Sequence, residues 1–200
     1  MQEIKHPRFA AETYISVDVE TSGPNPSSYD LLSIGACLAD KPEVGFYVEL
    51  QPATGNAIPG ALAISRLSIE QLAETGVPPA VAMQQFDTWV RGVVPEDHRA
   101  VFVALNAPFD WMFVNDYFHR YLRFNPFGHS ALDIKAFYMG LAGVHWSQTS
   151  MQVLSSRYLR GRRLTHNALQ DARDQAEVFG LILAEATSHI CGAASRRSEP

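Results

Sequence analysis

The sequence has few cysteines, no long apolar run and no excess of positive charge, and each shortage excludes a class of protein. Its 200 residues contain two cysteines, Cys37 and Cys191, in unrelated contexts without the spacing of a metal site. They are typical of buried thiols in a reducing compartment rather than of a disulfide framework. No apolar run approaches the roughly 20 residues that cross a bilayer, and residues 1–13 lack the apolar stretch of a secretory signal. We therefore expect a cytoplasmic protein without a membrane partner.

The formal net charge of -5 bears on any nucleic-acid partner. A protein that holds long nucleic acid along its backbone is usually basic, because much of the affinity comes from neutralising phosphates. This chain therefore either binds no nucleic acid, or holds only a few nucleotides and uses metal ions as its main positive charge.

Length and composition fit one compact domain. The hydrophobic share of 46% and the charged share of 18% are ordinary for a globular protein. The chain shows no internal repeat, linker or domain boundary. We expect residues 1–12 to form an N-terminal extension, 13–190 the domain and 191–200 a flexible tail.

The apolar patterns predict an antiparallel meander followed by alternating helices and strands. β-Branched and aromatic residues indicate strands at 13–19, 31–38 and 45–50, with short connections between them. From Ser68, which with Gln71 forms a helix-start signal, the spacing becomes helical. Further helices are expected at 80–93, 108–121, 151–158 and 166–186, and short strands at 100–105 and 132–134. This order predicts an α/β fold in which helices pack on one mixed sheet.

Two acidic residues end the first predicted strand. Asp18 and Glu20 are two apart, so their side chains lie on the same face of the strand. Carboxylates so close repel each other, and a divalent cation such as Mg²⁺ or Mn²⁺ removes that conflict. The alternative is an ordinary strand end whose acidic residues enter a turn.

A third carboxylate, Asp110, lies where a predicted strand meets a helix. Asn106 suits a helix N-cap and Pro108 a first turn, which places Asp110 in that turn. An acidic residue there also complements the helix dipole without any further role.

His166 and Asp171 stand at the start of the last predicted helix. The imidazole projects from the entry turn and is the natural base near neutral pH, since free histidine has a pKa of about 6.5. Asp171 is held by the helix and suits a metal ligand, and we favour it over Asp174, one turn further on, as the ligand. The alternative is a capping histidine and a solvent-facing aspartate.

Together these pieces resemble the DEDDh family of 3′→5′ exonucleases. The matching motifs are Val17-Asp18-Val19-Glu20-Thr21, Asn106-Ala107-Pro108-Phe109-Asp110 and His166-Asn167-Ala168-Leu169-Gln170-Asp171-Ala172, in that order. The likeness extends over about residues 14–183 and implies a ribonuclease H-like fold, a meander followed by parallel strands. One departure is Leu105, at a position where the family often has a polar residue.

The resemblance implies catalysis with two Mg²⁺ or Mn²⁺ ions around the scissile phosphate. Asp18, Glu20 and Asp171 would hold one ion, and Asp18 and Asp110 the other. His166 would take a proton from the attacking water, and a nucleoside 5′-monophosphate would leave.

The same resemblance places four residues against the 3′-terminal nucleotide: Thr21, Ser22, Gly23 and Ile64, the last as an apolar wedge. The arginines at 157, 160, 162 and 163 either guide the nucleic-acid backbone or form a solvated loop.

The expected partner is the 3′ end of single-stranded or frayed DNA or RNA. Within the family, an enzyme similar to ribonuclease T or oligoribonuclease and a proofreading or repair exonuclease both fit. From other classes, a catalytically silent nucleic-acid-binding or polymerase-associated module and a phosphatase of small phosphate esters stay open. The sequence is also compatible with a homodimer or with a polymerase or repair partner.

Overall fold

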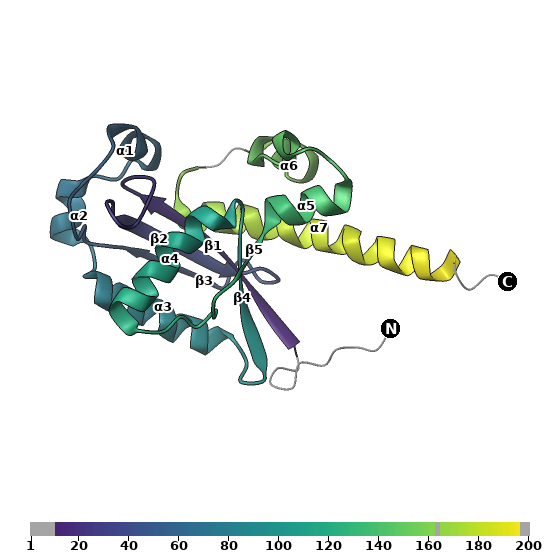
Figure 1. The fold of residues 1–200 in the computed structure, drawn as a ribbon, viewed down its shortest axis with the longest axis horizontal. Coiled ribbons are helices and arrows are strands. Elements are labelled where there is room, and N and C mark those ends of the chain that lie inside the picture. The colour runs from purple at the N-terminus through teal and green to yellow at the C-terminus, as the bar shows by residue number, and fades with distance from the viewer. Residues whose placement is uncertain (1–10, 163–164, 197–200) are drawn as a thin grey trace.

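The computed structural model describes residues 11–162 and 165–196, with side chains up to residue 188. Its centre is a five-stranded sheet with helices packed on it (Figure 1). The strands are β1 (Ala11–Thr21), β2 (Leu31–Leu38), β3 (Gly45–Glu49), β4 (His98–Ala104) and β5 (Ala131–Asp133). They lie in the order β3-β2-β1-β4-β5. β1, β2 and β3 pair antiparallel, whereas β4 and β5 run parallel to β1. The predicted meander with added parallel strands is confirmed.

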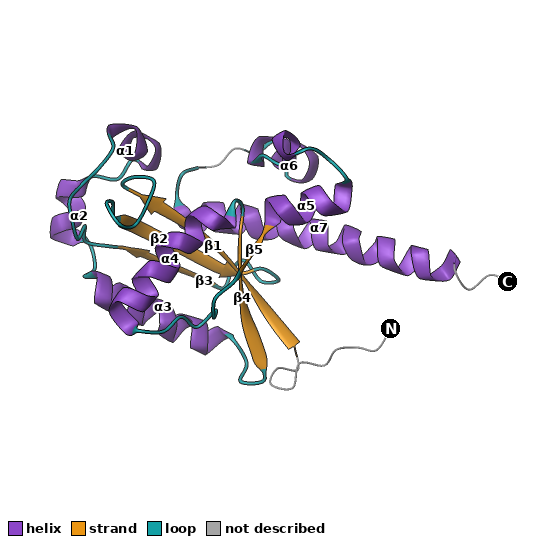
Figure 2. Cartoon of the chain, viewed as in Figure 1, coloured by secondary structure: helices purple, strands orange, loops and turns teal. Residues whose placement is uncertain are grey.

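Helices cover the two faces of this sheet (Figure 2). α3 (Pro79–Val93) and α4 (Ala107–Leu122) pack on the face that presents Ile15 and Val17 of β1. α7 (Ala168–Arg196) crosses the other face, over β1, β2 and β3. The shorter helices are α1 (Pro59–Ser65), α2 (Ile69–Thr75), α5 (Ile134–Ala142) and α6 (Met151–Tyr158), with a 3₁₀ turn at Trp146–Gln148.

The alternation of β1 decides which side chains meet which helix. Ile15, Val17 and Val19 join the large core with α3 and α4. Because strand side chains alternate, Asp18 and Glu20 face the side that α7 covers. Since β1, β4 and β5 are parallel, their carboxyl ends meet at one edge of the sheet, where the acidic motifs lie.

A glycine in β2 allows α7 to come close to the sheet. Gly35 pairs with Asp18 in the β1–β2 ladder. A Cβ at Gly35 would lie 2.1 Å from the backbone of Ala168 and Leu169, at the start of α7. The absence of a side chain there therefore brings the first turn of α7 next to Asp18.

Several predicted boundaries differ from the structure. The helices α1 and α5 have no counterpart among the predicted elements. α7 begins at Ala168 rather than at 166, because His166 has a left-handed backbone with φ 55°. Sequence periodicity identifies long helices better than short ones, which have too few turns to show a pattern.

The ends of the chain are only partly described. β1 begins at Ala11, inside the expected extension 1–12, and α7 continues to Arg196, inside the expected tail 191–200. Residues 1–10 and 197–200 lie outside the described part. Among the described residues, no helix is both long and apolar enough to cross a membrane.

Candidate active site

Asp18, near the end of β1, is held in place by a side chain of α7. The Nε2 of Gln175 donates a 2.6 Å hydrogen bond to Oδ1 of Asp18. Burial raises the pKa of Asp18 well above its ordinary value, and the charges of Asp110, Glu20 and Asp171 raise it further. This carboxylate is therefore surrounded by three others.

Glu20 and Asp110 share the same electrostatic conflict. Burial, followed by the charge of Asp171, raises the pKa of Glu20 to about 7. Burial also raises the pKa of Asp110 to about 8, although the hydrogen bond from the Val19 backbone opposes the rise. In the metal-free protein the ionisation of these acids is unfavourable, and a nearby cation would make it more favourable.

Asp110 is positioned by the start of α4, as predicted, but not by the expected cap. It is 5% exposed, and its Oδ1 accepts a 3.1 Å hydrogen bond from the Val19 backbone N–H. Asn106 occupies the N-cap position as predicted, but its backbone is left-handed and its side chain makes no capping bond. Instead, Oδ1 of Asp133 accepts hydrogen bonds from the backbone N–H groups of Asn106 and Ala107.

Asp171 fixes the segment that carries the histidine. It is 2% exposed, and its Oδ1 accepts bonds from the backbone N–H and the hydroxyl of Thr165, at 2.8 and 3.0 Å. Its Oδ2 accepts a 2.9 Å bond from the His166 backbone N–H. The His166 imidazole is exposed and takes no part in these bonds.

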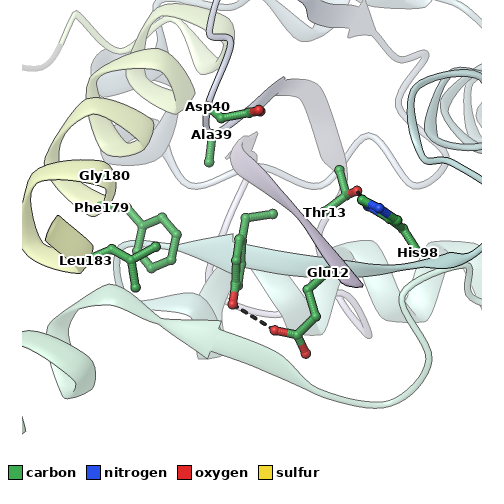
Figure 3. A pocket seen from close by; sticks show the side chains of 9 residues that line it. Glu12, Thr13, Ala39, Asp40, His98, Phe179, Gly180 and Leu183 are labelled. Atoms are coloured by element: carbon green, nitrogen blue, oxygen red, sulfur yellow. Dashed lines mark hydrogen bonds between the residues drawn. The ribbon is translucent and has the colours of Figure 1, made fainter. Parts of the chain in front are cut away.

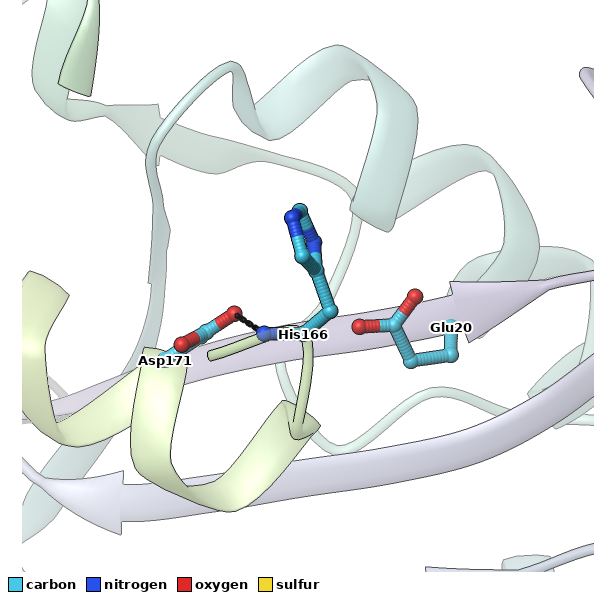
Figure 4. Close-up of side chains that lie close together, drawn as sticks. All are labelled: Glu20, His166 and Asp171. Atoms are coloured by element: carbon cyan, nitrogen blue, oxygen red, sulfur yellow. Dashed lines mark hydrogen bonds between the residues drawn. The ribbon is translucent and has the colours of Figure 1, made fainter. Parts of the chain in front are cut away.

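Three groups from three segments converge at this point. Glu20, His166 and Asp171 each offer a ligand atom, and these atoms all lie within 4.8 Å of one another. Figure 4 shows the carboxylates of Glu20 and Asp171 on either side of the histidine. Asp18 and Asp110 are not part of this group, but Asp18 is close enough for both Glu20 and Asp171 to raise its pKa.

Asp174 makes side-chain contacts that stabilise the fold. It is 1% exposed, and its Oδ1 accepts a 2.7 Å hydrogen bond from Arg162 and a 3.0 Å bond from Gln170. Arg162 also pairs with Glu177, so both of its acidic partners lie on α7.

The other arginines of the predicted basic segment differ in their contacts. Arg157 pairs with Glu185 and stacks over Tyr138 and Tyr158. Arg160 is exposed with a left-handed backbone, and residue 163 lies outside the described residues. Arg157 and Arg162 therefore brace the fold through ion pairs, while their side chains stay about half-exposed.

The residues expected near the terminal nucleotide lie at the same edge. The Thr21 hydroxyl donates to the Gly23 carbonyl, and the Ser22 hydroxyl donates to the Asn56 carbonyl. A Cβ at Gly23 would collide with the Tyr29 ring. Ile64 on α1 is 54% exposed.

Comparison with known proteins agrees with this geometry. No family model matches the chain. The 3'-5' DNA exonuclease Cap18 of Escherichia coli is 47% identical over 171 residues, which cover 86% of this chain and 91% of that protein. Ribonuclease T of Actinobacillus pleuropneumoniae is 29% identical and covers 86% of this chain and 84% of its own. The nuclease domain of 3'hExo, a DEDDh family member bound to rAMP, superposes with a TM-score of 0.68 at 15% identity, covering 87% of this chain and 92% of its own.

The chain belongs to the DEDDh family of 3′→5′ exonucleases. It is therefore a nuclease that hydrolyses terminal phosphodiester bonds of nucleic acid, and the predicted enzyme class and fold are confirmed. The silent binding module and the phosphatase of small esters are set aside. The family depends on divalent metal.

The residues at the edge fit such a metal. Oxygen ligands from carboxylates are what Mg²⁺ and Mn²⁺ prefer. Glu20 and Asp171 each offer a carboxylate oxygen, and these lie within 4.8 Å of each other, close enough to share one ion. Burial raises the pKa values of Asp18, Glu20 and Asp110, and the charges of neighbouring carboxylates raise them further, which is the environment that a cation would relieve.

Two residues at the active site were not predicted from the sequence. Gln175 contacts Asp18, and Asp133 holds the start of α4 while also capping α5 through Lys135 and Ala136. Asp133 ends β5 directly before α5, and aspartate is a typical N-cap residue, so the sequence carried a signal for this role. Gln175 had no comparable signal.

A separate cavity of about 240 Å³ lies near the opposite end of β1. Thr13 and Tyr14 of β1, His98, and Phe179 and Leu183 of α7 line it (Figure 3). Six residues of strand, about 20 Å, separate Tyr14 from Glu20. This cavity is therefore not part of the active site.

Proposed function

We propose that this exonuclease shortens single-stranded or frayed DNA from its 3′ end, with Mg²⁺ or Mn²⁺ ions held by four carboxylates. The carboxylates are Asp18, Glu20, Asp110 and Asp171. The observation that carries the proposal is the convergence of Glu20 and Asp171 on His166 within 4.8 Å, beside the half-buried Asp18.

The two ions would polarise the scissile phosphate and stabilise the charge that develops on it. Asp18 would hold the ions together with Glu20, Asp110 and Asp171, whose charges all raise the pKa of Asp18. Three hydrogen bonds hold the Asp171 carboxylate, two on Oδ1 and one on Oδ2, and leave about one lone-pair site, on Oδ2, for a metal ion.

His166 would act as general base. Its backbone N–H is fixed by Asp171, while its exposed imidazole stays free to reach a water molecule at the phosphate. The ring would accept the proton of that water and pass it to solvent. A fixed backbone with a free side chain suits a base that must move a proton in and out of the site.

The 3′-terminal nucleotide would bind between the end of β1 and α1. The side chains of Thr21 and Ser22 are engaged in internal bonds, so their contribution would come from the backbone. Gly23, whose lack of a side chain leaves room for the Tyr29 ring, would contact the nucleotide through its backbone, and Ile64 would pack against the terminal base as an apolar wedge.

DNA is proposed as the substrate because of the relatives. The protein that is 47% identical is named a DNA exonuclease, whereas the ribonuclease T relative is 29% identical. The higher identity extends over a similar share of this chain and favours DNA.

A nuclease assay tests the proposal. Matched 5′-labelled and 3′-labelled DNA and RNA oligonucleotides, single- and double-stranded, would be incubated with Mg²⁺, Mn²⁺ or EDTA. We expect metal-dependent shortening of single-stranded DNA from its 3′ end. Asp18→Ala and His166→Ala should lower the rate at least about 100-fold, whereas Asp40→Asn, an exposed acid outside the site, should not. Faster cleavage of RNA would overturn the DNA assignment, and full activity of Asp18→Ala would overturn the site.

The cytoplasmic location and a homodimer or polymerase partner stay predictions. The Cys37 thiol is buried and its pKa is raised to about 12, mainly by burial, which agrees with an unreactive structural cysteine. Cys191 lies where side chains are not described.

A further inference from the structure

Gln175 joins three elements of the active-site edge through one buried amide. It lies on α7 and is 2% exposed. Its Nε2 donates to Oδ1 of Asp18 on β1 at 2.6 Å, and its Oε1 accepts from the Leu105 backbone N–H at 2.8 Å. Leu105 follows β4 directly and leads into the segment that starts α4.

The two bonds decide which way the amide points. A backbone N–H is a donor only, so the Leu105 contact requires the amide oxygen on its side. The NH₂ group must then face Asp18, where it forms a charge-assisted bond to the carboxylate. Reversing the amide would place two donors against each other and two oxygens against each other. The orientation is therefore imposed by the contacts.

We propose that Gln175 is a positioning residue that aims the Asp18 carboxylate at the metal ions. This inference rests on the proposed function, in which Asp18 is a metal ligand. A carboxylate has about four lone-pair sites, and Gln175 occupies one of them on Oδ1. The remaining sites, including both on Oδ2, stay available for metal.

One helix, α7, positions two of the proposed metal ligands, Asp171 and Asp18. Gln175 is four residues beyond Asp171, which places both on the same face of the helix. Gly35 allows that face to approach Asp18 closely. α7 thus supplies Asp171 directly and orients Asp18 through Gln175. A small rotation of α7 would disturb both carboxylates together.

Manganese binding provides a test that does not depend on activity. Mn²⁺ would be titrated into metal-free Gln175→Met by calorimetry, with Gln170→Met as the matched control. Gln170 is on the same helix and donates to Asp174 instead of Asp18. We expect Gln175→Met to bind Mn²⁺ about 10- to 100-fold more weakly, and Gln170→Met to bind it like the wild type. Wild-type affinity in a folded Gln175→Met would overturn the proposal.

A second variant covers the case in which Gln175→Met does not fold, because it leaves the Leu105 N–H without its acceptor. Gln175→Glu keeps an acceptor for Leu105 and replaces the donor to Asp18 by an oxygen. We expect a lower kcat at saturating Mn²⁺ with an unchanged KM for the oligonucleotide. An unchanged kcat would contradict the positioning role.

Asp18→Asn separates this inference from the proposed function. If Asp18→Asn binds Mn²⁺ and cleaves normally, Asp18 is not a ligand and the proposed site fails. If Asp18→Asn loses both properties while the Gln175 variants keep them, only the role of Gln175 fails.

Discussion

Gly35 lies directly across the β1–β2 ladder from Asp18, and the backbone of Ala168 passes over it at the start of α7. The same close approach places Asp171 and Gln175, both on α7, next to the carboxylates of β1. The position of the last helix, and with it the active site, therefore depends on a residue that carries no functional group.

Gly35→Ala should displace α7. The added Cβ would lie 2.1 Å from backbone atoms, which cannot move away as a side-chain end can. We expect a loss of about 1–3 kcal/mol of stability, together with weaker Mn²⁺ binding. Thermal unfolding measures the first effect and calorimetry the second. Gly92→Ala on α3, where a Cβ meets nothing within 4 Å, is the control. An unchanged melting temperature for Gly35→Ala would contradict the proposed close packing.

The metal-free protein should become less stable as pH rises from about 4 to about 8. The pKa values of Glu20 and Asp110, about 7 and about 8 in the fold, exceed the ordinary 4.5 and 3.8. Within this window the folded chain binds more protons than the unfolded chain, so raising the pH favours unfolding. Asp110→Asn should flatten the dependence. Unfolding in EDTA across the pH range measures it, and stability that rises with pH and does so equally in Asp110→Asn would refute the account.

Divalent metal should reverse that loss. A ligand that binds only the folded state at 100 times its Kd adds about 2.7 kcal/mol, or about 5–10 °C in melting temperature for a chain of this size. At pH 8 we expect Mn²⁺ to raise the melting temperature of the wild type by this amount. Asp18→Asn should respond much less, and an equal response in both proteins would place the metal elsewhere.

Arg162 should stabilise the fold more than Arg157 does. Arg162 pairs with Asp174, whose side chain is 1% exposed, so Arg162→Ala leaves a buried carboxylate without its charged partner. We expect a loss of about 1–3 kcal/mol. Arg157 pairs with the half-exposed Glu185, and exposed pairs contribute about 0–1 kcal/mol. Denaturant unfolding of both variants compares them, and a larger loss for Arg157→Ala would contradict this ranking.

Ile64 should affect substrate binding without affecting stability. Its side chain is 54% exposed on α1, so Ile64→Ala removes little buried surface. As an apolar wedge it should raise KM for a DNA oligonucleotide about 3- to 10-fold, which corresponds to about 0.7–1.4 kcal/mol. Val81→Ala on α3, 47% exposed and outside the site, should leave KM unchanged. Equal KM values for the wild type and Ile64→Ala would contradict the role of Ile64 as an apolar wedge.

Local rules of the chain explain what could be predicted. Strand alternation is enough to place Asp18 and Glu20 on one face, and the helix-start pattern is enough to put Asp110 in a first turn. Both predictions use residues close in sequence. The fold could be predicted because the apolar patterns of β1, β2, α4 and α7 identify these elements without knowledge of their packing.

The contacts between distant segments could not be predicted in this way. Gln175 and Asp18 are 157 positions apart, and their hydrogen bond depends on how closely α7 approaches β2. The cap of α4 was assigned to Asn106 by a local rule, whereas the structure takes the acceptor from Asp133 on a neighbouring strand. The sequence left Arg162 either as a guide for the nucleic-acid backbone or as part of a solvated loop. Its partners Asp174 and Glu177 lie 12 and 15 positions further along the chain and reach it only once α7 is in place.

The most direct test of the central claim is a crystal structure with Mn²⁺, located by anomalous scattering. The account predicts two peaks roughly 3.5–4 Å apart, with Asp18 between them, Glu20 and Asp171 at one peak and Asp110 at the other. A map with no peak among these four carboxylates, in crystals of protein that cleaves DNA with Mn²⁺, would contradict it.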